Sequence, residues 1–252
     1  MGFPDQPPAD GGVDLHIAFG VDSKFVPPMG ACMNSILNHN PDLKLQFHVV
    51  THSMSAAAAA QIDDFAAQRG IDIRIHKIDE ARLATLPPPP QPYSYATYLR
   101  LLVPEMLKGH AERVLYVDAD IVCLGSLKGL VGFSFDGNIV AAVAEELPEK
   151  LRQSLRDLVR LPLSAPYFNS GVLFFDIEQW HAREATPRVL QALRDSGGRF
   201  PFADQDGINM VLNDQVKPID DRWNYVFRQG RPREDTVFYH YTFQKPWHLL
   251  VG

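Results

Sequence analysis

Short apolar runs and longer stretches with apolar positions at helical spacing alternate through the first eighty residues. Apolar runs bounded by turn residues are typical of strands, and a 3.6-residue apolar spacing is typical of helices. Ser55 and Gly70 are suited to begin and end the second helix, as N-cap and C′ residue. The predicted strands are 14–19, 43–51 and 71–78, and the predicted helices are 29–37 and 55–68. This βαβαβ order predicts a parallel sheet covered by helices.

The same two patterns continue through the rest of the chain. Further strands are predicted at 114–117, 139–144, 172–176 and 237–241, and further helices at 93–107, 148–160, 180–194 and 203–212. The proline-rich stretch 87–92 is interpreted as a connecting loop, with a polyproline ligand for a partner domain as the alternative. The chain shows neither an internal repeat nor a clear linker. We therefore expect a flexible N-terminal segment, 1–12, and a single α/β domain over 13–252.

Composition narrows the classes of function. The chain has 252 residues, 46% of them hydrophobic, which is enough for a sizeable core. Its net charge of −6 disfavours a nucleic-acid partner. Two cysteines without a CxxC pattern fit a reducing compartment. The N-terminus lacks the apolar core of a signal peptide, and no run of eighteen apolar residues occurs, so a cytoplasmic location is predicted.

The chemistry is concentrated in the sequence Asp118-Ala119-Asp120, which follows the predicted strand 114–117. Two carboxylates one residue apart repel each other, and the apolar residues Ile121 and Val122 raise the cost of keeping both ionised. A divalent cation would offset that cost, and short carboxylate ligands suit Mg²⁺ or Mn²⁺. The alternative interpretation is a solvated turn at the end of a strand.

The DxD pattern alone is weak, because Asp204 and Asp206 form a second one. Haloacid-dehalogenase-like phosphatases also end a strand with DxD, but they require Ser or Thr two residues after the second Asp, where this chain has Val122. No GxGxxG follows a predicted strand, which argues against a dinucleotide-binding domain.

A wider set of motifs resembles the retaining glycosyltransferases of family 8, which include bacterial lipopolysaccharide galactosyl- and glucosyltransferases and, as a relative, glycogenin. The matching pieces are AFGVD at 18–22, YLR at 98–100, LYVDADIV at 115–122, FNSGVLFFD at 168–176, ADQDGIN at 203–209, HY at 240–241 and KPWH at 245–248. They cover the chain from about residue 14 to residue 248. The resemblance implies a GT-A nucleotide-diphospho-sugar transferase fold, with a mixed, mostly parallel sheet flanked by helices.

The resemblance also implies roles for individual residues. Asp118, Asp120 and His240 resemble the ligands of a metal ion, for which Mn²⁺ is preferred and Mg²⁺ is the alternative. The other interpretation of His240 is a hydrogen-bonded core histidine. The residues implied in binding the UDP-sugar are Asp22, Arg100, Asp118, Ala119, Asn169, Asp204 and Lys245. For Asp22 a helix cap, and for Arg100 a structural salt bridge, are the alternatives.

The implied catalytic residues are Asp204, Gln205 and Asp206. Gln205 would lie near the anomeric carbon, where its amide is a poor nucleophile, so a front-side mechanism is favoured over a covalent intermediate on Asp204 or Asp206. Glu145 resembles an acidic group near the acceptor, with a solvated loop charge as the alternative. The chain departs from the family in having four residues between His240 and Lys245, with Phe243 in the place of a glycine. A shorter and bulkier loop over the diphosphate is expected there.

These features together predict a metal-dependent retaining hexosyltransferase. Its donor would be a UDP-hexose, galactose or glucose, and its acceptor a glycan or lipid-linked oligosaccharide of the cell envelope, in particular a lipopolysaccharide core. The resemblance further implies peripheral contact with the inner face of the cytoplasmic membrane. A non-catalytic sugar-nucleotide-binding homologue and a glycogenin-like glucosyltransferase are the alternatives. The choice between galactose and glucose is left open by the sequence.

Overall fold

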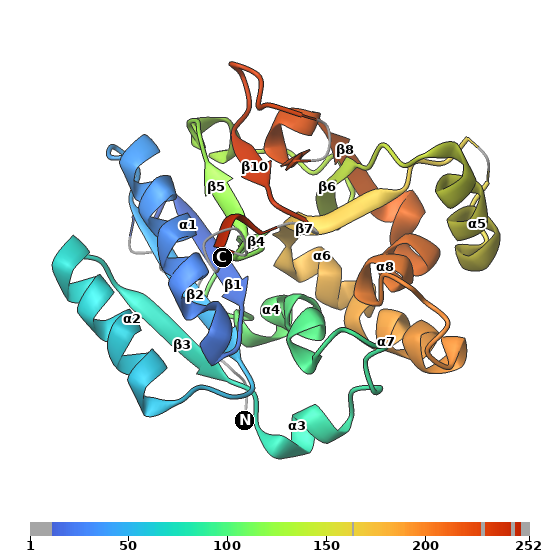
Figure 1. Ribbon diagram of the computed structural model, residues 1–252, viewed down its shortest axis with the longest axis horizontal. Helices are drawn as coiled ribbons and strands as arrows, with labels where there is room; N and C mark the ends of the chain where they lie inside the picture. Colours follow the sequence, from blue (N-terminus) through green and yellow to red (C-terminus); the bar gives the residue numbers. More distant parts are fainter. Residues whose placement is uncertain (1–11, 163, 228–229, 243–244, 248–252) are drawn as a thin grey trace.

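A seven-stranded sheet forms the centre of the computed structural model, which describes residues 12–162, 164–227, 230–242 and 245–247 (Figure 1). The strand order is β3-β2-β1-β4-β7-β6-β8. The strands are β1 (Leu15–Gly20), β2 (Leu45–Thr51), β3 (Ile73–Lys77), β4 (Arg113–Val117), β6 (Val140–Ala144), β7 (Phe168–Asp176) and β8 (Val216–Ile219). The four strands from β3 to β4 run parallel, and β7 is antiparallel to both β4 and β6. The predicted mixed, mostly parallel sheet is therefore confirmed.

A second sheet of three short strands lies beside the end of β4 and carries the distant C-terminal part of the chain. Its order is β5-β10-β9, with β5 (Ile121–Cys123), β9 (Tyr225–Val226) and β10 (Phe238–His240). β5 and β10 pair antiparallel with Ile121 opposite His240. This register brings the C-terminal histidine next to the DxD sequence, from which it is 120 residues away in the chain.

Helices cover both faces of the large sheet. One face packs against α1 (Val26–His39), α2 (Ala56–Arg69) and the small sheet, and the other packs against the helices that follow β3 (Figure 1). The latter are α4 (Leu99–Met106), α5 (Glu149–Val159), α6 (Ile177–Ala182), α7 (Ala185–Ser196) and α8 (Asp204–Leu212), with the short α3 (Glu80–Ala84) before them. None of the described helices has the length and the apolar character needed to cross a bilayer.

Three predicted elements differ from those observed. The helix expected over 93–107 is a short 3-10 helix, Tyr95–Tyr98, followed by α4, because the Ser94 hydroxyl caps the backbone N–H of Ala96. The helix expected over 180–194 is broken into α6 and α7 at Glu184, whose φ of 52° lies in the left-handed region. The strand expected over 172–176 begins earlier, at Phe168, so the FNSG sequence is itself part of β7.

The proline-rich stretch 87–92 connects α3 to the 3-10 helix, as the loop interpretation predicted. Leu86 and Pro87 are buried, and Pro90 accepts a backbone hydrogen bond from Tyr93. The N-terminal segment 1–11 lies outside the described residues.

Candidate functional site

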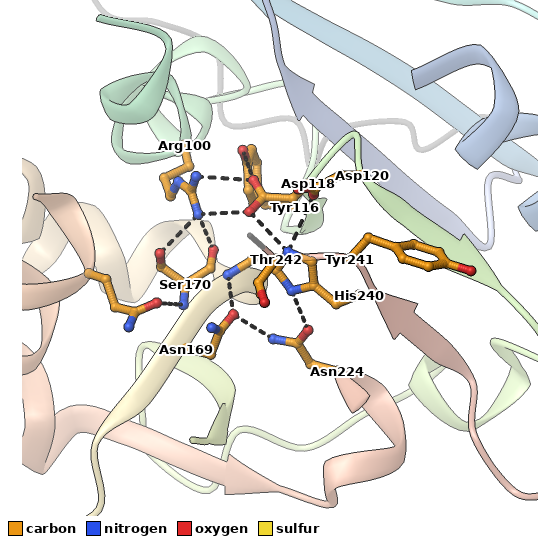
Figure 2. Close-up of polar contacts among 12 residues, drawn as sticks. Arg100, Tyr116, Asp118, Asp120, Asn169, Ser170, Asn224, His240, Tyr241 and Thr242 are labelled. Atoms are coloured by element: carbon orange, nitrogen blue, oxygen red, sulfur yellow. Dashed lines mark hydrogen bonds and ion pairs between the residues drawn. The ribbon is translucent and has the colours of Figure 1, made fainter. Parts of the chain in front are cut away.

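The two aspartates of the DxD sequence occupy the turn between β4 and β5. The backbone N–H of Asp118 donates to the carbonyl of Gly171 on β7 at 2.8 Å, and the carbonyl of Asp120 accepts from the N–H of Tyr241 at 3.0 Å. The turn is thus fixed to both sheets, and its carboxylates face the His240 ring (Figure 2). This position is the carboxyl edge of a parallel strand, where open α/β sheets bind their ligands.

Asp118, Asp120 and His240 form a group that could hold a metal ion. One ligand atom from each lies within 4.8 Å of the others. His240 Nε2 is 3.3 Å from Asp120 Oδ1 and 3.8 Å from Asp118 Oδ2, and the imidazole is buried. Two carboxylates and one imidazole are a donor set that suits Mn²⁺. The carboxylates would also suit Mg²⁺. The three residues predicted as metal ligands are therefore brought together, and they fit a divalent cation.

The charges around Asp118, Asp120 and His240 also favour a bound cation. A cavity of about 230 Å³ lies over the group and is lined by Tyr93, Thr97, Arg100, Asp118, Asp120, Glu145, Asn169, Ser170, Gly171, Phe202, Asp204, Gln205, His240, Thr242 and Lys245. Four of these side chains are carboxylates and two, Arg100 and Lys245, are cations. Burial alone would raise the pKa of Asp120, but the adjacent His240 and Lys245 outweigh it and lower this pKa. The site thus holds an excess of negative charge that a cation or a cationic transition state would neutralise.

Arg100 joins the metal-binding group to the sugar side of the cavity. Its guanidinium lies 3.0 Å from Asp118 Oδ1 and donates to the Ser170 hydroxyl at 2.9 Å (Figure 2). It also lies 3.1 Å from Asp204 Oδ2. Burial lowers its pKa, but Asp118 and Asp204 raise it by more, so Arg100 stays charged. The structure shows the salt bridges that were the alternative for this arginine and places it in the wall of the cavity, while its role in donor binding stays a prediction.

Asp204 is placed in the cavity by the first turn of α8. Its Oδ1 accepts from the Thr97 hydroxyl at 2.5 Å, and burial raises its pKa. The preceding Ala203 has φ 47° and ψ −116°, a conformation that only glycine adopts without strain. Such strain persists where the surrounding structure requires it, and here it aims the start of α8 at Arg100.

Gln205 and Asn169 line the cavity and share a carboxylate. Both side-chain amides donate to Glu145 Oε2 at 3.0 Å, and Gln205 Oε1 accepts from the backbone N–H of Ser170. Glu145 is therefore part of the cavity wall, which excludes the solvated-loop alternative for this residue.

The second aspartate of the DQD sequence points elsewhere. Asp206 accepts from the Tyr167 hydroxyl at 2.5 Å and from the backbone N–H of Phe202 at 2.7 Å, and burial raises its pKa to about 6. It is absent from the residues that line the cavity. Residues i and i+2 of a helix lie on different sides, so Asp204 and Asp206 could not both face one ligand.

Of the remaining predicted residues, some lie at the cavity and one lies away from it. Lys245 lines the cavity and forms an ion pair with Asp120 Oδ2, while Ala119 lies between the two aspartates, 9% exposed. Asp22 caps the 3-10 helix Ser23–Phe25 by accepting from the N–H of Lys24, as the cap alternative predicted, and does not line the cavity. Phe243, which stands in the place of a family glycine, lies outside the described residues, so the expected shorter and bulkier loop stays a prediction.

Several site residues were not found by sequence reasoning. Tyr116 donates to Asp118 Oδ1 at 2.7 Å, and Asn224 Oδ1 lies 2.8 Å from His240 Nδ1 (Figure 2). Strand alternation could have identified Tyr116, because side chains two residues apart point to the same face. No local signal marks Asn224, which comes from a turn far along the chain.

The chain is similar to known glycosyltransferases over nearly its whole length. The profile of the family described as Glycosyl transferase family 8 matches residues 16–250. The lipopolysaccharide 1,3-galactosyltransferase of Salmonella typhimurium is 32% identical over 248 residues, covering 93% of this chain and 73% of the relative. The lipopolysaccharide glucosyltransferase WaaO of Escherichia coli is 31% identical over 247 residues, with the same coverage of both chains.

Among solved structures, the galactosyltransferase LgtC in complex with donor and acceptor sugar analogs matches with a TM-score of 0.81. It shares 23% sequence identity, over 93% of this chain and 90% of that one. Mouse xyloside xylosyltransferase 1 matches with a TM-score of 0.69 at 17% identity, over 93% and 99% of the two chains. These likenesses confirm the GT-A architecture.

Proposed function

Because this chain belongs to glycosyl transferase family 8 and is similar to lipopolysaccharide galactosyl- and glucosyltransferases, we propose that it transfers galactose or glucose from a UDP-sugar to a hydroxyl group of a lipopolysaccharide core. The observation that carries the proposal is the meeting of Asp118, Asp120 and His240 at a cavity that Asn169, Asp204 and Gln205 also line. A sugar nucleotide presents a diphosphate and a polyhydroxylated ring, and these two groups of residues offer partners for each.

We assign the cation to Asp118, Asp120 and His240, where Mn²⁺ would neutralise charge on the departing diphosphate. Lys245 would donate to the same diphosphate, after exchanging its contact with Asp120 for one with phosphate oxygen. Arg100 keeps Asp118 and Asp204 at a fixed separation, so that the diphosphate side and the sugar side of the site stay aligned.

The sugar would be held by hydrogen bonds from Asn169, Asp204 and Gln205. Asn169 and Gln205 present amides, and Asp204 presents a carboxylate for hydroxyl groups. We propose that transfer proceeds on the front side: the acceptor hydroxyl attacks C1 from the face that UDP leaves, the bond from C1 to the diphosphate breaks, and the departing diphosphate takes the hydroxyl proton. Gln205 would support the developing positive charge. A covalent intermediate would require Asp204, since Asp206 points toward Tyr167 and Phe202 and does not line the cavity.

Three predictions concern the whole chain: its domain boundaries, its location and its contact with the membrane. We propose that residues 13–252 act as one GT-A domain, of which the family profile matches 16–250. The cytoplasmic location and the peripheral contact with the membrane face stay predictions, and they concern where the acceptor is met rather than how the donor is held.

The proposal is tested by donor hydrolysis and transfer with UDP-galactose, UDP-glucose and UDP-N-acetylglucosamine, each with Mn²⁺ and with a chelator. We expect UDP release from one of the two unmodified hexose donors and its loss on chelation. A protein that binds UDP but releases none from any donor, with or without lipopolysaccharide acceptor, would be a non-catalytic homologue.

Gln205→Ala distinguishes the two mechanisms. In the front-side mechanism the amide stabilises charge but does not form a bond, so we expect turnover to fall by about 10- to 100-fold without disappearing. Complete loss, together with a glycosyl adduct on Asp204 seen by mass spectrometry of the intact protein, would instead indicate double displacement.

A further inference from the structure

Asn224 is a buried amide that connects a proposed metal ligand to the sugar side of the cavity. It lies between the 3-10 helix Asp221–Trp223 and β9, and it is 2% exposed. Its Oδ1 lies 2.8 Å from His240 Nδ1, and its Nδ2 donates to Asn169 Oδ1 at 2.7 Å (Figure 2). Both ends of the side chain are thus engaged where water has no access.

The direction of these hydrogen bonds is set at the Asn169 end. The Glu145 carboxylate accepts, so it faces the Nδ2 group of Asn169 at 3.0 Å. The backbone N–H of Gly171 donates, so it faces Asn169 Oδ1 at 2.8 Å. Two groups that hydrogen-bond in one sense only therefore fix the orientation of the Asn169 amide.

The orientation of Asn224 follows from that of Asn169. The carbonyl oxygen of Asn169 requires a donor, so Asn224 turns its NH₂ group toward it and its oxygen toward His240. An oxygen beside His240 Nδ1 requires a proton on that nitrogen. Nε2, which faces Asp118 and Asp120, is then the nitrogen with a free lone pair in the neutral ring.

Packing holds the ring in the same place. A Cβ at position 171 would come within 2.8 Å of His240 Nδ1 and nearer still to Cε1, so only glycine leaves room for the imidazole against β7. The ring is therefore confined by β7 and oriented by the amide of Asn224.

We infer that Asn224 is a positioning residue: its side-chain oxygen holds the proton on His240 Nδ1 and so presents Nε2 as a ligand for a divalent cation. The cation itself rests on the proposed function, whereas the position of the proton does not. Partners of this kind, on the far nitrogen of a ligating histidine, orient the ring and raise its basicity, and their loss lowers metal affinity by about 10- to 100-fold.

The first test needs neither metal nor substrate. Nitrogen-15 spectra of the metal-free protein, labelled at histidine, report which ring nitrogen carries a proton. The His240 signals are assigned by their loss in His240→Gln. We expect the neutral ring, reached by raising the pH, to carry its one proton on Nδ1. A neutral ring with its proton on Nε2 would overturn the inference whether or not the protein is a transferase.

The second test measures Mn²⁺ affinity in the presence of UDP, from the electron paramagnetic resonance signal of free Mn²⁺. We expect Asn224→Leu to raise the dissociation constant for Mn²⁺ by about 10- to 100-fold. Asn224→Asp, which keeps an oxygen facing Nδ1, should recover most of the affinity. The matched control is Asn40→Leu, since Asn40 is 3% exposed and also bonds at both ends of its amide, to Ile36 and Leu127, outside the cavity.

Equal Mn²⁺ affinity in Asn224→Leu and Asn40→Leu would overturn the inference. If Asn224→Leu does not fold, the Nδ1 measurement on the wild-type protein decides. If the wild-type protein binds no Mn²⁺ although Nδ1 carries its proton, the proposed function fails while the assignment of the proton stands.

Discussion

The large sheet and its neighbour bury histidines in two places that differ in what surrounds the rings. On β1, β2 and β3 three imidazoles form a ladder: His16 Nδ1 lies 3.0 Å from His48 Nε2, and His48 Nδ1 lies 3.0 Å from His76 Nε2. On β10 the single ring of His240 faces two carboxylates on one side and the amide of Asn224 on the other. Both arrangements are hydrogen-bonded, and the rings of His16, His48 and His240 are buried, so burial and bonding alone do not distinguish a site from a structural feature.

The difference lies in the charge of the neighbours. Burial, followed by the neighbouring His16 and His76, lowers the pKa of His48 to about 3, so the central ring of the ladder is neutral at physiological pH. The carboxylates around His240 supply the oxygen ligands that a hard divalent cation requires. Within the part of the chain that the structure describes, one group of ligand atoms is close enough to hold a metal ion, that of Asp118, Asp120 and His240. In this chain the carboxylates beside His240 are what distinguish a metal-binding group from the histidine ladder.

Removing either carboxylate beside His240 should have the largest effect on transfer activity. We expect Asp118→Asn or Asp120→Asn to lower metal-dependent transfer by about a thousandfold or more, because a bound metal contributes several kcal/mol to stabilising the departing group. The measurement is UDP release with Mn²⁺, and circular dichroism checks that the variant is folded. Near-wild-type turnover in either folded variant would show that the aspartates are not metal ligands.

Displacing the ring without touching a ligand should have the next largest effect. In Gly171→Ala the added Cβ overlaps His240, so the ring must move, and we expect turnover to fall by about 100-fold. Gly30→Ala is the matched control: it lies on α1 with nothing within 4 Å of its added Cβ, and alanine favours a helix by about 1 kcal/mol. Equal activity in the two variants would contradict the tight packing of His240 against β7.

The ladder should respond to pH through stability rather than activity. Because the folded-state pKa of His48 is below its ordinary value of 6.5, the unfolded chain binds more protons as pH falls below 6.5. Stability is therefore fully present above pH 6.5 and is lost in acid. Between pH 6.5 and pH 5 the free energy of unfolding should fall by about 2 kcal/mol from His48 alone.

His48→Leu tests this assignment. Denaturant titrations at several pH values should show a shallower pH dependence for the variant, while its turnover at pH 7.5 stays within about threefold of the wild type when the protein is folded. An unchanged slope would mean that His48 is charged in the folded protein, and a large loss of turnover would mean that the ladder and the cavity are coupled.

Much of the architecture could be predicted because local pattern decides it. The apolar runs around β1, β2 and β4 and the caps at Ser55 and Gly70 depend on neighbouring residues in the chain, and each is observed. The errors arose where a single residue changes the backbone. Glu184 interrupts a continuous helical pattern by adopting a left-handed conformation, which no side-chain periodicity records.

The residues of the site could be identified in part for the same reason. Asp118, Asn169, Asp204 and Lys245 belong to short motifs, and all four line the cavity. Asp206 belongs to one of those motifs as well, but α8 turns it toward Tyr167. A motif specifies which residue types occur together, while the helix decides which of them share a side.

By itself, the sequence determined the alternation of strands and helices and the types of ligand available, because these depend on residues adjacent in the chain. Tertiary structure alone decided how they meet. The pairing of β5 with β10 sets His240 opposite Ile121, next to Asp120, and the turn before β9 brings Asn224 to the far side of the ring. The first contact joins segments more than a hundred residues apart and the second joins residues 16 apart. The geometry of both depends on sheet register and packing, which no local pattern encodes.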